Sequence, residues 1–421
     1  MAPAPSRLRA TFHAHAGGLP RLYWVLWWGT FINRLGSFAV PFIALYLTRE
    51  RGMGAAAVGL VASLHGLGGL LAAYLGGALA DRIGRRPTLI GALCCGAGSM
   101  VLLALARQPA LIALAAFSLG LLGDMYRPAV SAAIADVVPA DRRAQAFTLF
   151  YWVVNLGFAV ALPTAGLLSR AGFSVLFFAD ATTTLLYAAV VWRLLPETRP
   201  RQAAAAARGG LRSVLLTLAP FRDRAFLAFA LPVFLLVIVF FQHMVALPLT
   251  LEARGMSDTA WGLVLGTNGA LIVLLQPFAG RWVERLPRGA VLAGACVLTG
   301  AGFGLHGLSG GVALAVLAVA VWTAGEIMHA PVASSVVADL APPAVRGTYQ
   351  GAYFMLWGLA AFLGPLLGGW VLGHAPASAL WAGCLALGLL AAALQAGAAA
   401  VRRRQLAALR QVRPDISAAL D

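Results

Sequence analysis

Residues 77–88 read GALADRIGRRPT and form a short charged segment between two long apolar runs. The preceding run covers residues 57–76 and the following run covers residues 89–106. The segment carries four charged side chains within six positions: Asp81, Arg82, Arg85 and Arg86. These side chains cannot lie in hydrocarbon without a large free-energy cost, so the chain is expected to reach the membrane surface here. Gly77 and Gly84 allow a tight turn. A connection this short makes the flanking helices antiparallel neighbours.

The composition of the whole chain is typical of a polytopic membrane protein. Of its 421 residues, 61% are hydrophobic and 11% are charged, and the mean hydropathy is +0.84. No soluble globular domain has this composition. A membrane-spanning helix needs about 20 apolar residues, so about twelve such helices fit into the chain.

Twelve apolar runs can be placed along the chain, six in each half. In the first half they cover residues 21–48, 57–79, 88–106, 109–138, 144–168 and 172–195. In the second half they cover residues 225–251, 259–280, 289–308, 311–338, 347–373 and 376–401. The predicted organisation is therefore an N-terminal bundle (1–195), a linker (196–224) with one surface helix near 211–218, a C-terminal bundle (225–401) and a tail (402–421).

The arginines predict the orientation of the chain in the membrane. The chain contains no lysine, and all 31 basic residues are arginine. Even-numbered connections and both termini hold 24 of them, whereas the opposite side holds five. The positive-inside rule places the arginine-rich side, and with it both termini, in the cytoplasm. The net charge of +16 is spread between apolar runs instead of forming one patch, so nucleic-acid binding is not expected.

The two halves are copies of one another at a fixed offset of 203 residues. Glycines, prolines and charged residues recur at this offset; examples are Gly59 and Gly262, Pro128 and Pro331, and Asp136 and Asp339. Such a constant offset over most of each half indicates an internal duplication.

The segment at residues 77–88 resembles the loop 2–3 signature of the major facilitator superfamily, G-x-L-A-D-R-x-G-R-[RK]. The resemblance implies an all-α membrane protein of twelve helices in two pseudo-symmetric bundles, with a substrate site near mid-membrane and alternating access. In that family the motif gates the cytoplasmic side. The resemblance assigns this conformational gating role to Gly77, Asp81, Arg82, Gly84, Arg85 and Arg86. The second copy, at residues 280–288, is degraded and lacks the second glycine of the motif.

Five ionisable residues lie deep in apolar runs: Arg34, Asp124, Arg127, Asp180 and Glu326. Each would cost about 2.5–3.5 kcal/mol or more if it were buried without compensation, so they are expected to face the bundle interior, water or each other. All five are predicted to take part in proton coupling. Asp124 and Arg127 share one helix face and suit either a structural pair or a proton-coupled carboxylate. A structural pair is the favoured interpretation of Asp180.

Glu326 carries the strongest prediction of a direct role. It lies one residue from the repeat image of Asp124, and His329 follows at i+3. A mid-membrane glutamate suits a proton carrier and equally suits an anchor for a cationic substrate.

Further polar and aromatic residues could line a substrate cavity. The predicted substrate-binding set is Asn33, Asn155, Gln242, His243 and Trp357. Residues of these types more often form helix–helix hydrogen bonds or packing contacts. The four cysteines lie in apolar runs and are predicted to be core residues, because none has metal-ligand spacing.

No phosphate-binding glycine loop or catalytic triad pattern is present, so enzyme activity is not predicted. No cofactor or metal is expected, and an ion gradient, most simply of protons, is the predicted energy source. The expected partners are a small-molecule substrate, protons and the lipid bilayer, and the chain is expected to act as a monomer in the cell inner membrane.

Within the superfamily, the pattern is most similar to the twelve-helix bacterial drug:proton antiporters. Their fifth-helix signature GPxxGG is altered here to ALPTAG at residues 161–166, whereas its repeat image at 364–369 reads GPLLGG. The resemblance implies efflux of small lipophilic or cationic compounds. Short patches around Tyr151 and Glu326 resemble proton-coupled oligopeptide transporters and imply symport of peptide-like or other small polar solutes instead, although the first-helix E-x-x-E-R motif of that family is absent. A non-transporting receptor or assembly partner is the alternative of another class.

Overall fold

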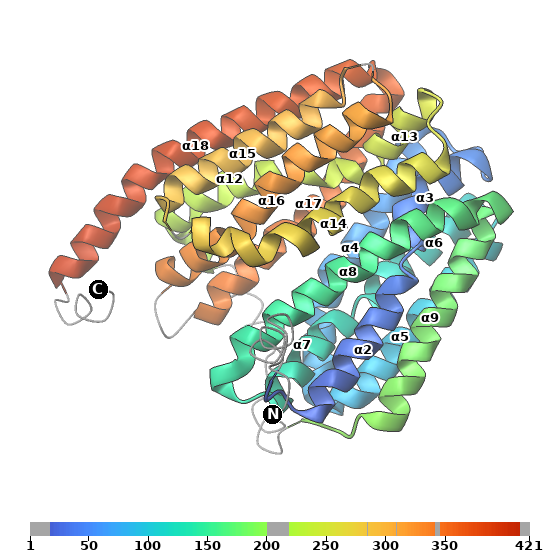
Figure 1. Ribbon diagram of the computed structural model, residues 1–421, viewed down its shortest axis with the longest axis horizontal. Helices are drawn as coiled ribbons and strands as arrows, with labels where there is room; N and C mark the ends of the chain where they lie inside the picture. Colours follow the sequence, from blue (N-terminus) through green and yellow to red (C-terminus); the bar gives the residue numbers. More distant parts are fainter. Residues whose placement is uncertain (1–16, 200–218, 284, 309, 342–345, 413–421) are drawn as a thin grey trace, which may run out of the picture. The chain divides into compact units, whose positions relative to one another are not determined.

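The computed structural model describes residues 17–199, 219–283, 285–308, 310–341 and 346–412 (Figure 1). These residues form helices joined by short turns and contain no β-strand. Twelve helices or helix pairs in the described part are long and apolar enough to cross a membrane. The predicted all-α, twelve-span fold is therefore confirmed. The predicted surface helix near 211–218 lies outside the described residues.

The helices of the first half begin and end within a few residues of the predicted runs. They are α2 (Arg21–Leu35), α3 (Ala39–Arg49), α4 (Ala55–Ile83), α5 (Arg85–Leu105), α6 (Pro109–Ser118), the π-helix η1 (Leu119–Gly123), α7 (Tyr126–Val137), α8 (Arg143–Leu168) and α9 (Phe173–Leu194). Two short 3-10 turns, η2 (Ala140–Arg142) and η3 (Ser169–Ala171), flank α8.

The second half repeats this order. Its helices are η4 (Ala219–Arg222), α12 (Arg224–Phe240), η5 (Phe241–His243), α13 (Ala246–Ala253), α14 (Asp258–Val283), α15 (Arg288–Leu305), α16 (Val312–Leu340), α17 (Arg346–His374) and α18 (Ala377–Val412). The last helix continues beyond the predicted membrane run.

Two membrane-spanning segments are interrupted at equivalent places. The first span is broken between Leu35 and Ala39, where α2 gives way to α3. The seventh is broken after Phe240, where a 3-10 turn separates α12 from α13. Adding the repeat offset of 203 to residues 36–38 gives residues 239–241, so the duplication extends to the position of the break.

The chain divides into two compact units, each containing segments of both halves. Unit 1 consists of residues 1–46, 64–208 and 258–273, and unit 2 consists of residues 47–63, 209–257 and 274–421. In unit 1, α2 and α5 pack against α9, around a buried core that includes Tyr23, Leu89 and Val191. In unit 2, α15 packs between α16 and α18, and a core around Phe229 and Val337 joins α12, α16 and α17.

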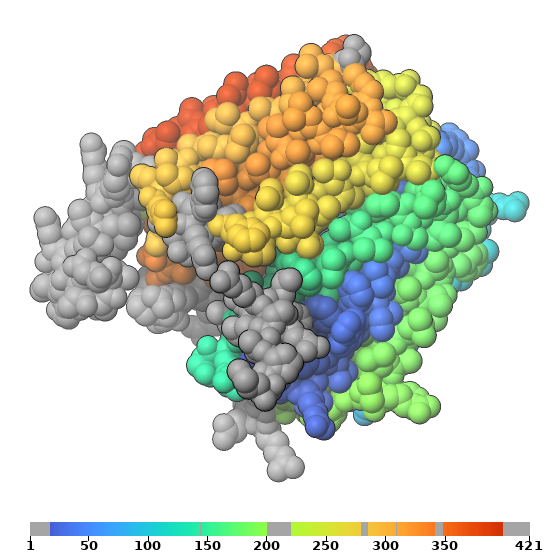
Figure 2. All heavy atoms as spheres, viewed as in Figure 1, coloured from blue at the N-terminus to red at the C-terminus, as the bar shows by residue number. Residues whose placement is uncertain are grey.

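Pairs of glycines bring helices of the two halves into close contact within each unit. In unit 2, Gly59 of α4 lies against Gly369 of α17, and a Cβ added at Gly369 would lie 2.8 Å from the Gly59 Cα. In unit 1, Gly262 of α14 lies against Gly166 of α8, and residues 258–273 of α14 run beside α8 (Figure 1 and Figure 2). The two pairs are repeat images of one another, because Gly59 corresponds to Gly262 and Gly166 to Gly369.

The structure corrects the prediction for the cysteines. Cys296 and Cys384 are buried, as predicted, whereas Cys94 and Cys95 are exposed. The hydropathy of their run reflects the apolar surroundings of a membrane-spanning helix and therefore does not distinguish a protein core from a lipid-facing surface.

One buried histidine of unit 2 lies just outside the membrane-spanning segments. His306 follows α15, is 2% exposed and packs against the ring of Trp381 at 5.5 Å. Burial, with a smaller effect of Arg254, lowers the pKa of His306 to about 4, so the side chain is neutral at neutral pH.

Candidate functional site

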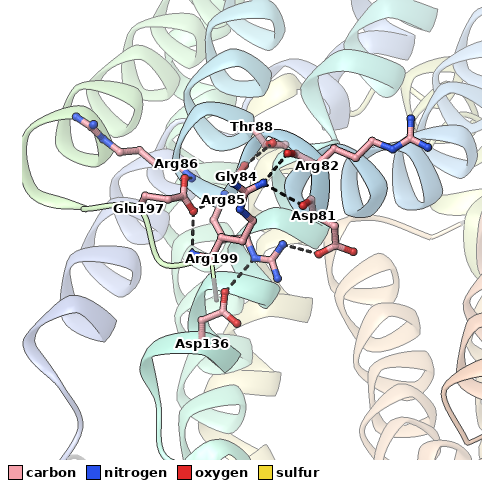
Figure 3. Close-up of polar contacts among 9 residues, drawn as sticks. All are labelled: Asp81, Arg82, Gly84, Arg85, Arg86, Thr88, Asp136, Glu197 and Arg199. Carbon is pink, nitrogen blue, oxygen red and sulfur yellow. Dashed lines mark hydrogen bonds and ion pairs between the residues drawn. The ribbon is translucent and has the colours of Figure 1, made fainter. Parts of the chain in front are cut away.

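Side chains of the charged segment at residues 77–88 connect three helices of unit 1 (Figure 3). Asp81 lies at the end of α4, Arg85 begins α5 and Asp136 lies near the end of α7. Arg85 Nε donates to Asp136 Oδ2 at 2.9 Å, and the same guanidinium forms an ion pair with Asp81. The Arg85 and Asp136 side chains are 7% and 14% exposed, so their charge-assisted hydrogen bond is shielded from solvent, whereas the Asp81 side chain is 49% exposed.

Glu197, which follows α9, caps the N-terminus of α5. The backbone N–H of Arg85 donates to Glu197 Oε1 at 2.9 Å, and that of Arg86 donates to Oε2 at 3.2 Å. Gly84 has φ +115°, and a Cβ at this position would lie 2.2 Å from Glu197 Oε2. The positive φ therefore favours glycine at this position, and the missing Cβ leaves room for the carboxylate. A negative charge at this site also interacts favourably with the helix dipole.

Arg199, in the segment that follows α9, connects this segment to the end of α4. Its backbone N–H donates to Glu197 Oε1 at 2.9 Å, and its Nη1 donates to the carbonyl of Asp81 at 3.2 Å. Sequence reasoning missed both Glu197 and Arg199, since they lie more than 100 residues from their partners. Asp136 was recognised only as the repeat image of Asp339, and its ion pair with Arg85 was not predicted.

The remaining predicted gating residues lie around this network. The backbone carbonyl of Arg82 accepts a hydrogen bond from Arg199. Arg86 Nη2 donates to the carbonyl of Trp192 at 2.6 Å. A Cβ added at Gly77 would meet no other atom within 4 Å, so space does not require glycine there. In unit 2, Arg288 and Asp339 form the ion pair equivalent to Arg85 and Asp136, and Glu284 lies outside the described residues.

The structure brings four of the five predicted proton-coupling residues together in unit 1. Arg127 Nε donates to Asp124 Oδ1 at 2.8 Å, next to the π-helix η1 that interrupts the fourth span. Arg34 is 8% exposed and interacts electrostatically with both Asp124 and Asp180. Its guanidinium carbon lies 5.5 Å from the centre of the Tyr126 ring and 5.4 Å from that of Phe158.

Asp180 binds backbone amides instead of a neighbouring guanidinium. Its Oδ2 accepts hydrogen bonds from the N–H of Phe38 at 3.2 Å and of Ala39 at 3.1 Å, at the start of α3. Asn33, a predicted substrate ligand, donates from Nδ2 to Thr184 Oγ1 at 2.9 Å and is 6% exposed. Both side chains thus connect the broken first span to α9.

Two more predicted substrate ligands, Asn155 and Gln242, donate hydrogen bonds to backbone carbonyls of the helices. Asn155 Nδ2 donates to the carbonyl of Tyr151 at 3.0 Å, one turn earlier on α8. Gln242 Nε2 donates to the carbonyls of Ile238 and Gly364, both at 3.0 Å, and so joins η5 to α17.

The other predicted ligands, His243 and Trp357, belong to an aromatic group in unit 2. The group consists of Phe240, Phe241, His243, Trp322 and Trp357. The Phe240 ring centre lies 4.8 Å from that of His243, 5.6 Å from Trp322 and 5.9 Å from Trp357. The Nε1 atoms of both tryptophans are buried without a hydrogen-bond partner. Phe240 and Trp322 were not predicted.

Glu326 is half-buried on α16 in unit 2. It follows Trp322 by four residues, so the carboxylate and this member of the aromatic group share one helix face. His329, one turn further, is 4% exposed. No group of three or more His, Cys, Asp or Glu side chains suited to a metal ion occurs within the described ranges.

The family model for the Major Facilitator Superfamily matches residues 26–365 and 243–414, and the chain belongs to this family. A Na(+), Li(+), K(+)/H(+) antiporter of Planococcus maritimus is 28% identical over 80% of this chain and 86% of the relative. The multidrug resistance protein MdtH of Yersinia pestis (strain Pestoides F) is 27% identical over 80% of this chain and 83% of its own length.

Two solved transporters share the fold. The nucleoside transporter NupG superposes with a TM-score of 0.73 at 16% identity, over 90% of this chain and 99% of that chain. The peptide transporter POT in complex with sulfate gives a TM-score of 0.74 at 20% identity, over 92% and 95%. The prediction of a multi-pass membrane transporter, rather than an enzyme, is confirmed by the family match and by these relatives.

Proposed function

We propose that the protein is a secondary active transporter that exports small lipophilic or cationic compounds in exchange for protons, by alternating access. One observation carries the proposal: Glu326 is a half-buried carboxylate on a membrane-spanning helix, one turn from the aromatic group of unit 2. Aromatic faces attract organic cations and bury their apolar surface, and a carboxylate supplies the opposite charge.

Mutual exclusion at Glu326 would couple the two fluxes. A carboxylate inside a membrane is costly in its charged form, so it binds either a proton or a positively charged substrate group. If it cannot hold both at once, substrate release requires proton binding and proton release requires substrate binding. Each pH unit of gradient supplies about 1.4 kcal/mol to such an exchange.

The charged network of unit 1 would supply the conformational gate. Asp81, Arg85 and Asp136 connect the ends of three helices, so relative movement of these helices has to break charge-assisted hydrogen bonds. We place this network, both termini and the arginine-rich connections on the cytoplasmic side of the inner membrane, with the chain acting as a monomer without a cofactor. The arginine distribution supports that orientation.

A second candidate is exchange of alkali cations for protons. The Planococcus maritimus relative is named as a Na(+), Li(+), K(+)/H(+) antiporter, and a carboxylate can compensate an inorganic cation as well as an organic one. The aromatic group one helical turn from Glu326 favours the organic cation, since hard inorganic cations require several oxygen ligands.

Flux in proteoliposomes under an imposed pH gradient tests the proposal. The probes are the lipophilic cation tetraphenylphosphonium, sodium ion and the dipeptide dialanine, each with wild type, Glu326→Gln and the control Glu50→Gln, an exposed carboxylate. We expect movement of tetraphenylphosphonium against the proton flow in wild type and Glu50→Gln, and at least a tenfold loss in Glu326→Gln. Accumulation of dialanine along the proton flow would overturn efflux, and exchange of sodium alone would select the second candidate.

A further inference from the structure

At the break in the first membrane-spanning segment, backbone amides at the start of α3 donate hydrogen bonds to the side chain of Asp180. The amides of Gly36 and Ser37 bond back to the carbonyls of Asn33 and Arg34, both at 3.2 Å, and so complete α2. The amide of Ala39, the first residue of α3, lacks an intrahelical partner. It donates to Asp180 Oδ2 at 3.1 Å. The preceding amide of Phe38 is shared between Asp180 Oδ2 at 3.2 Å and the Gly36 carbonyl at 2.7 Å, so Ala39 is the amide that depends most on the carboxylate.

α9 holds the broken span on both sides of the interruption. Thr184 accepts a hydrogen bond from Asn33 before the break, and Asp180 caps α3 after it. Between them, Gly36 lies so close to α9 that an added Cβ would be 1.9 Å from Thr183 Oγ1. Asp180 is 3% exposed, so the cap lies in the protein interior and its strength depends on the charge of the carboxylate.

Arg34 of α2 is the charged group that interacts electrostatically with Asp180, and the Thr184 hydroxyl of α9 also hydrogen-bonds to this carboxylate. Arg34 interacts in addition with Asp124, Arg127 and Tyr187. His65 of α4 interacts in turn with Asp124. Arg34 Nε is buried and has no hydrogen-bond partner. The guanidinium therefore interacts with two carboxylates and retains one donor that neither of them satisfies.

We propose that Asp180 is a proton-binding site that controls the break in the first membrane-spanning helix. In its ionised form Asp180 accepts two amide hydrogen bonds at a helix N-terminus, where negative charge is favoured. A proton bound to Asp180 removes that charge, weakens the cap of α3 and leaves Asp124 as the acidic partner of Arg34. The inference rests on the proposed proton-coupled function for its purpose, but its test does not require transport.

Hydrogen–deuterium exchange of the purified full chain in nanodiscs measures the cap directly. Peptides covering residues 36–42 report the Phe38 and Ala39 amides, and exchange times are scaled for the intrinsic effect of pH. In wild type, the protection of these amides should fall by about five- to tenfold between pH 9 and pH 5, the size of a lost helix cap. In Asp180→Asn, which retains an acceptor oxygen without the charge, protection should not depend on pH.

Controls separate this proton site from a purely structural cap and from the proposed function. Asp141→Asn changes an aspartate whose side chain is 76% exposed and should retain the wild-type pH profile. Glu326→Gln should also retain it, since Glu326 lies in unit 2, so failure of the efflux proposal would leave this result unchanged. Wild-type protection that is constant with pH, or an Asp180→Asn variant that keeps the wild-type profile, would overturn the inference.

Discussion

Glu197 is an exposed side chain that nevertheless defines where α5 begins. Its two oxygens accept hydrogen bonds from consecutive backbone amides at a turn of only one residue, Gly84. The contact brings the extension after α9 to the start of α5 and allows Arg199 to reach the carbonyls of α4. One carboxylate therefore organises the ends of three membrane-spanning helices.

Removal of this cap should destabilise the protein measurably. Glu197→Ala leaves the amides of Arg85 and Arg86 without their acceptor, and the loss of an N-cap costs about 1 kcal/mol. Glu197→Gln retains one acceptor oxygen and should lose less, and Asp141→Ala, at an exposed aspartate, should have no effect. Thermal unfolding in detergent measures all three. Equal unfolding temperatures for Glu197→Ala and Asp141→Ala would contradict the capping role.

Individual contacts were predictable from the sequence only where helix geometry fixes them. The ion pair of Asp124 and Arg127 follows from i, i+3 spacing on one helix. The partners of Asp180 did not follow, because they are backbone amides at a break that leaves the hydropathy of the run unchanged. The aromatic group could be predicted only in part, since ring contacts between α12, α16 and α17 depend on side-chain packing.

At the scale of the helices, the contacts of Gly166 with Gly262 and of Gly369 with Gly59 explain why the altered GPxxGG signature at residues 161–166 is tolerated. Residues 161–166 keep Gly166 of the GPxxGG pattern, and this glycine packs against α14. Its image Gly369 packs against α4 in the same way. Close helix approach therefore depends on the last glycine of the signature, which both copies retain. The sequence predicted the repeat of these glycines, whereas their contact partners required the structure.

A methyl group at this contact should be costly. A Cβ at Gly369 would lie 2.5 Å from the Ala55 carbonyl oxygen and 2.8 Å from the Gly59 Cα, and backbone atoms cannot move aside cheaply. Gly369→Ala should therefore lower stability by about 1–3 kcal/mol. Gly98→Ala is the matched control, because a Cβ at Gly98 meets no other atom within 4 Å. The unfolding temperatures of the two variants test the contact, which would be refuted if they were equal.

At the scale of the whole chain, the duplication is visible in ion pairs as well as in helices. Arg288 and Asp339 repeat the pair of Arg85 and Asp136. The ion pair of Arg49 and Glu252 differs from these two pairs. Its two residues are repeat images of each other, and they bind one another within unit 2. Evolution after the duplication has therefore given opposite charges to equivalent positions. The apolar runs and the repeat predicted the architecture, since hydropathy and the constant offset extend over the whole chain.

A double variant that exchanges the charges of Arg49 and Glu252 should keep the stability of the wild type, whereas each single charge reversal should reduce it. Arg49→Glu and Glu252→Arg each place like charges side by side, whereas the double variant restores an ion pair. The side chains are 35% and 20% exposed, so a coupling free energy of about 0.2–1 kcal/mol is expected. A double-mutant cycle of unfolding measurements gives this value. Additive effects of the two single changes would show that the pair contributes nothing.

The composition of the two units has a consequence for any attempt to divide the chain. A cut within residues 200–218 would leave Glu197 and Arg199 attached to the helices that they bind. It would also separate residues 258–273 from unit 1 and residues 47–63 from unit 2. Neither fragment contains a complete unit. Two separate genes encoding the fragments should therefore yield a stable protein only when both are expressed in the same cell.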